Sequence, residues 1–215
     1  MSGKMPGIKI IIFFSNLFDY KLSPIMNSKT EKSLDPVSDT ALMLKVKAGD
    51  IDKLGLLYER YHKNLFGFFW RMSGNKEVSK DLVQTVFYRM LKNRTHYKGK
   101  GKFISWMYQI ARNLWIDHNK KNRRIDFREN MERWELKEGL NTDEQIEREE
   151  QLRQLRRALQ HLSEDKKEVL ILSRYQELKY SEIAKILNLS EGAIKIRVFR
   201  ALADLRELYL KIENQ

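Results

Sequence analysis

The sequence has no cysteine, only three prolines and no apolar run long enough to cross a membrane. Without cysteine it can form neither disulfides nor thiolate metal sites. Its most apolar stretch, residues 8–14, contains Lys9 and gives way to polar residues, whereas a spanning helix needs about 18 apolar residues. A secretory leader is also a poor match, because no small-residue cleavage pattern follows. We therefore predict a cytoplasmic protein.

The motifs of common enzymes are missing as well. There is no phosphate-binding glycine-rich loop, no H-E-x-x-H and no nucleophile elbow. The carboxylates of Glu147, Glu149 and Glu150 fit a solvated helix face, and the four histidines are scattered over positions 62, 96, 118 and 161. We therefore predict no catalytic residue, no metal site and no cofactor, which argues against a metal-dependent nuclease.

Positive charge is abundant and unevenly distributed. The chain carries 41 Lys+Arg against 29 Asp+Glu, a net charge of +12. Residues 39–122 hold 17 basic and 7 acidic side chains, residues 125–150 hold 4 and 10, and residues 151–215 hold 13 and 9. Two basic segments around an acidic one favour two nucleic-acid-binding domains and a linker. A role at an anionic membrane surface would explain the charge but not two helical cores.

Apolar residues recur at three- and four-residue steps, and no useful period-2 alternation occurs. The pattern predicts an all-α fold of two small helical domains joined by an acidic linker. The expected helices of the first domain run from Asp39 to Gly49, from Asp50 to Ser73, from Lys76 to about Asn93 and from Phe103 to about Lys121. The expected boundaries are 1–38 for an N-terminal tail, 39–122 for the first domain, 123–148 for the linker and 149–215 for the second domain.

The tail has a second interpretation. Residues 27–38 are charged and contain proline, as an ordinary frayed N-terminus does. We favour the hypothesis that translation starts at Met26 and that residues 1–25 are an over-extended start. Peptides from residues 1–25 in a mass spectrum of the native protein would contradict it.

The stretch Tyr180–Arg200, YSEIAKILNLSEGAIKIRVFR, predicts a helix-turn-helix. Ser181 is expected to cap the first helix and Ser190 the second. Asn188 falls at the turn, where a left-handed backbone is needed, and asparagine tolerates that conformation. The outward face of the second helix carries Glu191, Lys195, Arg197 and Arg200. Such a basic face suits the DNA major groove.

A second basic surface is predicted on the helix after Phe103. Its outward face is expected to hold Tyr108, Gln109, Arg112, Asn113, Lys120 and Lys121, next to the lysine-rich loop HYKGKGK at 96–102. An aromatic residue among cations suits a phosphate backbone with unstacked bases.

Three stretches resemble a bacterial RNA polymerase sigma factor of the extracytoplasmic-function (ECF) group in the sigma-70 family. They are LYERYHKNLFGFFWRMSGN (57–75), KDLVQTVFYRMLKNR (80–94) with FISWMYQIARNLWIDHNKK (103–121), and LKYSEIAKILNLSEGAIKIRVFRALADLRE (178–207). The resemblance implies a region 2 helical bundle and a region 4 helix-turn-helix. It also implies a protein that binds core RNA polymerase and directs promoter recognition and melting. It further implies site residues in three groups.

The group implied to bind core polymerase is Asp81, Leu82, Val83, Gln84, Val86 and Phe87. The group implied for the −10 element, read as non-template single strand, is Lys98, Lys100, Lys102, Tyr108, Arg112, Asn113, Asp117, His118 and Lys121. The group implied for the −35 duplex is Ser190, Glu191, Lys195, Arg197, Phe199 and Arg200.

The chain departs from the family pattern at Thr85, where Glu is frequent, at Asn188, where Gly is frequent, and at Ile196, where a small polar residue is common. The resemblance also leads us to expect an anti-sigma factor as a partner. The alternative function is a stand-alone helix-turn-helix transcriptional regulator. That alternative explains Tyr180–Arg200 and leaves the 80–121 block unexplained.

Overall fold

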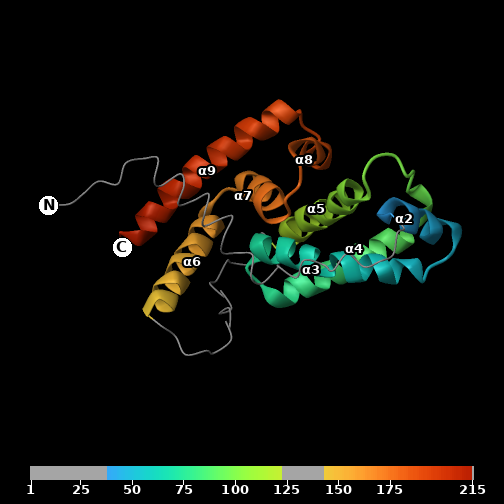
Figure 1. Ribbon diagram of the computed structural model, residues 1–215, viewed down its shortest axis with the longest axis horizontal. Coiled ribbons are helices and arrows are strands. Elements are labelled where there is room, and N and C mark those ends of the chain that lie inside the picture. The colour runs from blue at the N-terminus through green and yellow to red at the C-terminus, as the bar shows by residue number, and fades with distance from the viewer. Residues whose placement is uncertain (1–37, 123–142, 215) are drawn as a thin grey trace. The chain divides into compact units, whose positions relative to one another are not determined.

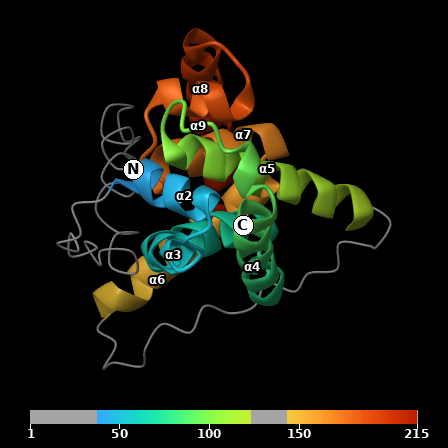
Figure 2. The ribbon, with the colours of Figure 1, turned by 90° about the vertical axis from the view of Figure 1, so that its right-hand side faces the viewer.

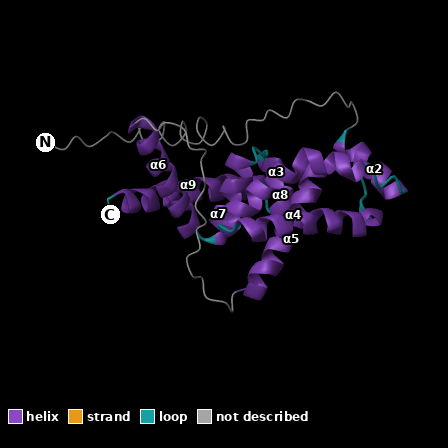
Figure 3. Ribbon diagram, turned by 90° about the horizontal axis from the view of Figure 1, so that it is seen from below, coloured by secondary structure: helices purple, strands orange, loops and turns teal. Residues whose placement is uncertain are grey.

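The computed structural model describes residues 38–122 and 143–214, and every regular element in these two ranges is a helix (Figure 1; Figure 3). The predicted all-α fold is confirmed. The predicted tail, with its Met26 alternative, lies outside the described residues except for Ser38, and so do residues 123–142 of the predicted linker. None of the helices in the described ranges is both long and apolar enough to span a membrane.

Four helices form the N-terminal domain. They are α2 (Asp39–Ala48), α3 (Lys53–Ser73), α4 (Lys76–Lys92) and α5 (Phe103–Asn122). Each buries the apolar stripe that its spacing predicts, because residues three and four apart share a helix face. The buried stripes include Leu42, Met43, Val46, Leu57, Leu65, Phe68, Phe69, Leu82, Val86, Met90, Met107, Ala111 and Leu114.

The connection between α3 and α4 follows the local sequence closely. Gly74 ends α3 in the left-handed conformation, with φ of 69°, where a residue without Cβ is unstrained. Asn75 then begins α4, and its side chain accepts a hydrogen bond of 3.0 Å from the Val78 N–H. This satisfies one of the backbone donors that a helix start leaves unpaired.

The C-terminal domain contains α6 (Asp143–His161), α7 (Glu164–Leu170), α8 (Tyr180–Leu187) and α9 (Glu191–Glu213). A π-helical turn, η3 (Ile171–Tyr175), extends α7, and the sequence pattern did not predict it. Helix α6 starts within the segment predicted as linker, so the described structure assigns residues 143–148 to a helix.

The helix-turn-helix prediction is confirmed except at its first cap. Asn188 adopts φ 55° and ψ 50°, and the Ser190 side chain accepts a hydrogen bond of 3.1 Å from the Ala193 N–H. Ser181 was predicted to cap α8, which is wrong, because α8 already includes Tyr180. Instead the Glu182 carboxylate accepts a bond of 2.9 Å from the Lys179 N–H, one residue before the helix.

The left-handed turn gives a stability prediction. Replacing Asn188 by alanine should lower the free energy of unfolding by about 1–2 kcal/mol, because a Cβ without a polar group is strained in this conformation. Replacing it by glycine removes the strain but adds backbone entropy to the unfolded chain, so the change should stay within about 0.5 kcal/mol. Urea unfolding followed by circular dichroism checks both. Equal losses for both variants would contradict the turn's role.

Helix α5 lies on the side of the N-terminal domain that faces the C-terminal domain. It packs against α4 on one side and against α8 on the other, and two views at right angles agree on this order (Figure 1; Figure 2). Residues 39–215 consequently form one unit rather than two separate ones. The surface of α5 predicted to face nucleic acid is therefore next to the C-terminal domain.

Candidate nucleic-acid and polymerase interfaces

The outer face of α9 presents an exposed basic and aromatic surface. Lys195 and Arg200 are exposed, and Phe199 keeps 75% of its surface accessible. Ser190 and Glu191 stand at the helix start, where Ser190 acts as the cap. Glu191 lies 3.6 Å from the Lys195 ammonium, which is an exposed pair of small energetic weight.

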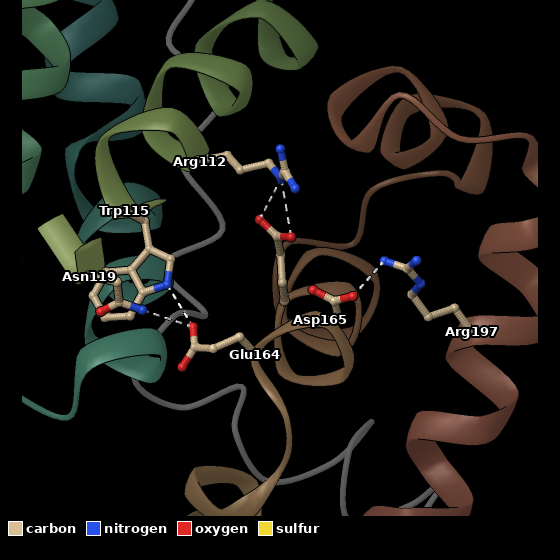
Figure 4. A network of polar contacts seen from close by, with 7 residues as sticks. Arg112, Trp115, Asn119, Glu164, Asp165 and Arg197 are labelled. Atoms are coloured by element: carbon tan, nitrogen blue, oxygen red, sulfur yellow. Dashed lines mark hydrogen bonds and ion pairs between the residues drawn. The ribbon is translucent and has the colours of Figure 1, made fainter. Parts of the chain in front are cut away.

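Arg197 points elsewhere. Its guanidinium is half-buried and lies 3.6 Å from the Asp165 carboxylate of α7 (Figure 4). The prediction that Arg197 shares the outward face is therefore wrong, because its guanidinium turns to Asp165 of α7 although Arg200, about 60° away around the helix axis, is exposed. Ile196, which sequence analysis left out of the site, is exposed instead. A pattern of charges alone does not reveal an exposed apolar residue such as Ile196.

The residues predicted to grip core polymerase separate into two sets. Leu82, Val83, Val86 and Phe87 are buried inside the bundle, where they form the packing side of α4. Their predicted contact with core polymerase stays a prediction. Asp81 and Gln84 are exposed on the opposite side, so the surface available for a partner is polar.

Tyr88 completes this exposed side of α4. It lies at the i+4 step from Gln84 and the i+7 step from Asp81, and 62% of its surface is accessible. These steps place the three side chains on one helix face. Tyr88 was not among the predicted site residues, although its place off the apolar stripe of α4 was readable from the spacing. A large exposed aromatic between two polar residues is typical of a protein–protein hot spot.

The predicted −10 residues that remain accessible lie in the loop before α5 and along the second half of the helix. Lys98 and Lys100 are exposed in the loop, and Gly99 and Gly101 turn that loop with φ of 66° and 82°. In the second half of α5, Asn113, Asp117 and Lys121 are exposed. Within the described ranges, none of these five polar residues forms a hydrogen bond or ion pair with the C-terminal domain.

Two residues near the end of α5 have charge partners or ring contacts of their own. Asp117 lies 3.4 Å from the Arg89 guanidinium. The His118 ring stacks on Trp115 with centroids 5.8 Å apart. Burial lowers the pKa of His118, and the charge of Lys121 lowers it further, so both effects favour the neutral ring.

Tyr108 is buried, with 1% of its surface accessible, so the prediction of an outward orientation is wrong. Its hydroxyl donates a hydrogen bond of 2.5 Å to Gln176 Oε1 of the C-terminal domain. Its ring packs edge-on against Phe68, with centroids 5.5 Å apart. Sequence periodicity could not show this, because the burying residue is contributed by a segment 68 positions away.

Arg112 and Lys102 each meet a carboxylate of the C-terminal domain. The Arg112 guanidinium lies 3.0 Å from Glu168, and the Lys102 ammonium lies 2.5 Å from Glu182 (Figure 4 for Arg112). Burial raises the pKa of Glu168, and the charge and hydrogen bond of Arg112 act against that rise. The pKa of Glu182 is lowered: burial raises it, but hydrogen bonds from Lys102 and the Lys179 N–H, with the two lysine charges, outweigh burial.

Glu164 of α7 joins the same network. Its carboxylate accepts 2.8 Å and 3.3 Å hydrogen bonds from the Trp115 indole N–H and the Asn119 amide (Figure 4). Gln109 donates a 2.8 Å bond to the backbone carbonyl of Lys185. Half of the predicted outward face of α5, namely Tyr108, Gln109 and Arg112, is thus paired with the C-terminal domain. Among the described residues, no group of three His, Cys, Asp or Glu is arranged to hold a metal ion.

Comparison with known proteins matches both halves of the chain. The family model for sigma-70 region 2 matches residues 57–125, and the model for sigma-70, region 4 matches residues 152–205. The ECF RNA polymerase sigma factor SigX of Bacillus subtilis (strain 168) is 31% identical over 157 residues, which cover 71% of this chain and 81% of SigX. The RNA polymerase sigma factor CarQ of Myxococcus xanthus is 29% identical over 175 residues, covering 80% of this chain and 97% of CarQ.

Two solved structures share the fold. CnrH in complex with the cytosolic domain of CnrY aligns with a TM-score of 0.62 and 22% identity, covering 79% of this chain and 96% of that chain. The sigma factor RpoE in complex with the anti-sigma factor NepR, from Bartonella quintana, aligns with a TM-score of 0.59 and 24% identity. The alignment covers 72% of this chain and 94% of that chain.

Proposed function

This chain belongs to the ECF RNA polymerase sigma factors of the sigma-70 family, and from that membership we propose how its surfaces divide the work. As a sigma factor it directs core RNA polymerase to promoters and is an initiation factor rather than an enzyme. We assign core binding and −10 recognition to residues 39–122 and −35 recognition to residues 149–215. Its place of action is then the cytoplasm, where polymerase and promoter DNA meet.

The observation that carries this function is the similarity to SigX, which extends over both domains in the same order. A stand-alone helix-turn-helix regulator would need only the C-terminal domain. The match of residues 57–125 to sigma-70 region 2 leaves that alternative without support.

For polymerase we propose the exposed side of α4, formed by Asp81, Gln84 and Tyr88. It offers a carboxylate, an amide and an accessible aromatic ring on one helix face. Aromatic residues flanked by polar ones supply much of the energy at protein interfaces. The apolar residues of the same helix hold this face in place from behind.

Replacing Tyr88 by alanine should weaken binding to core polymerase by about tenfold, since truncating an interface anchor costs more than ~1 kcal/mol. The fold should stay intact because the ring is exposed. Binding is measured with fluorescently labelled protein and purified core enzyme. Ile51→Ala, which also truncates an exposed apolar side chain of this domain, serves as the control and should bind normally. Equal affinity of both variants would remove Tyr88 from the interface.

For DNA we propose two surfaces. The loop lysines with Arg112, Asn113 and Lys121 would hold the opened −10 strand, whose bases are accessible once unstacked. The exposed residues of α9, Lys195, Phe199 and Arg200, would read the −35 duplex in the major groove. Arginine recognises guanine through two hydrogen bonds, and lysine positions the helix on phosphates.

Transcription in vitro tests the function as a whole. Core polymerase is incubated with and without this protein on a genomic promoter library, and transcript starts are sequenced. Starts that need the protein and share two upstream motifs are the expected result. If no such starts appear while the free protein binds specific duplex DNA, the stand-alone transcriptional regulator becomes the better explanation of its function.

We also propose an anti-sigma factor as a partner of this chain. The support is that RpoE of Bartonella quintana was solved with the anti-sigma factor NepR. Purification of the tagged protein from its own organism, followed by mass spectrometry, tests this. Recovery of polymerase subunits alone would leave the partner without support.

A further inference from the structure

Three carboxylates of the C-terminal domain converge on the face of α5 that the proposed function gives to −10 DNA. Glu164 and Glu168 come from α7, and Glu182 comes from α8. Glu164 accepts hydrogen bonds from Trp115 and Asn119, and Glu168 pairs with Arg112 (Figure 4). Glu182 pairs with Lys102. We call Glu164, Glu168 and Glu182 the carboxylate set.

We propose that the carboxylate set takes the place of DNA phosphates on this face, so that the free protein is held closed by its own C-terminal domain. The inference rests on the proposed −10 role of α5. A guanidinium and an ammonium that would bind phosphate oxygens instead bind carboxylate oxygens, which offer the same charge-assisted hydrogen bonds. The same atoms cannot hold both, so DNA and the C-terminal domain compete for them.

The burial of Glu168 and Glu182 shows that their pairs are interface contacts rather than loose surface pairs. Glu168 keeps 7% of its side-chain surface, and Glu182 keeps 10%. A carboxylate removed from water is costly unless a partner compensates it. Arg112 and Lys102, both from the N-terminal domain, supply that compensation, and separating the domains would return both carboxylates to water.

Contacts outside the carboxylate set also join the two domains. Tyr108 and Gln176 form a buried hydrogen bond across the two domains. Gln176 also donates a 3.3 Å bond to the Asn64 carbonyl, and the Arg71 guanidinium lies 4.2 Å from the centre of the Tyr175 ring. Tyr108 was predicted as a stacking surface for an unstacked base, and in the closed arrangement no base can reach its ring.

Closure leaves the other surfaces open. Phe199 and Arg200 of α9 are exposed, and so is the Asp81–Gln84–Tyr88 side of α4. The free protein is therefore able to meet polymerase and duplex while its −10 face is occupied. The apparent affinity for single-stranded DNA is reduced by the fraction of molecules that are open. Opening on polymerase would then couple −10 binding to assembly.

The test uses the full chain with Glu164→Gln, Glu168→Gln and Glu182→Gln combined, which keeps side-chain size and removes three negative charges. The control combines Glu59→Gln, Glu207→Gln and Glu213→Gln, three exposed positions with the same change in net charge. The probe is fluorescein-labelled oligo-dT, and binding is followed by anisotropy. We expect the carboxylate-set variant to bind at least fivefold more tightly than the control variant. Equal affinities would overturn the proposal.

A second measurement does not depend on how the variant folds. Because the chain has no cysteine, spin labels at Lys63→Cys and Arg157→Cys report one distance between the domains in the otherwise unchanged protein. A single narrow distribution in the free protein, widened by the carboxylate-set substitutions or by core polymerase, is expected. A broad distribution in the free protein would overturn closure. Either result is independent of transcription, so failure of the sigma function would be recognised separately.

Discussion

Replacing Phe68 by alanine is expected to lower the free energy of unfolding by about 3–5 kcal/mol, as losses of buried aromatic side chains do. Phe68 is fully buried in the centre of the N-terminal domain. Its ring packs edge-on against Phe69 and Tyr108, with centroids 5.2 Å and 5.5 Å away. Truncation would remove both aromatic contacts and leave a cavity between α3 and α5.

The expected loss is a large part of the ~5–15 kcal/mol that stabilises a typical domain. Because α5 rests on this cluster, the −10 face should lose its support as well. The matched control is Phe199→Ala, the same substitution at a residue that is 75% accessible. It should change stability by less than about 0.5 kcal/mol. Urea unfolding monitored by circular dichroism distinguishes them, and similar stabilities would contradict the packing of Phe68.

The helices themselves follow from local rules and were predictable. Apolar steps of three and four residues placed α2 to α5, and the sequence Ser73-Gly74-Asn75 placed the break between α3 and α4. Asn188 and Ser190 behave as their side-chain chemistry requires. Each of these features depends on residues within one or two helical turns, which a single sequence contains.

What was not predictable depends on partners far along the chain. Tyr108 looks outward relative to the apolar stripe of α5, yet Gln176 buries it. Arg197 fits a basic outer face by composition, yet Asp165 of α7 turns it inward. The −10 surface of the free protein is therefore a property of two domains together, and no pattern within one helix contains it.

The sequence also could not separate the residues of α4 that pack in the core from those that face solvent. A resemblance to a family identifies a segment of sequence and not the orientation of its side chains. In α4 the segment contains both residues that pack in the core and residues that face solvent. Leu82 and Phe87 pack, whereas Asp81, Gln84 and Tyr88 are accessible. Only burial separates the two classes.

The recognition helix gives the last prediction, a contrast between two arginines three residues apart. Arg200→Ala should weaken binding to the −35 duplex by about 5- to 150-fold, since a side chain that hydrogen-bonds a base edge contributes ~1–3 kcal/mol. Arg197→Ala should change it less than about twofold, because its guanidinium faces Asp165 and a partly exposed pair of this kind contributes under ~1 kcal/mol. Holoenzyme binding to the promoter found by transcription, measured at fixed salt, checks both.

The two variants lose the same charge from the same helix, so a general electrostatic effect would lower both affinities alike. A difference between them can come only from where each guanidinium points. If Arg197→Ala lost as much binding as Arg200→Ala, Arg197 would have to leave Asp165 and turn toward DNA in the complex, and the orientation of α9 against α7 would have to change on binding. If only Arg200→Ala lost binding, the outward set of Lys195, Phe199 and Arg200 would account for −35 recognition, with the exposed Ile196 beside it.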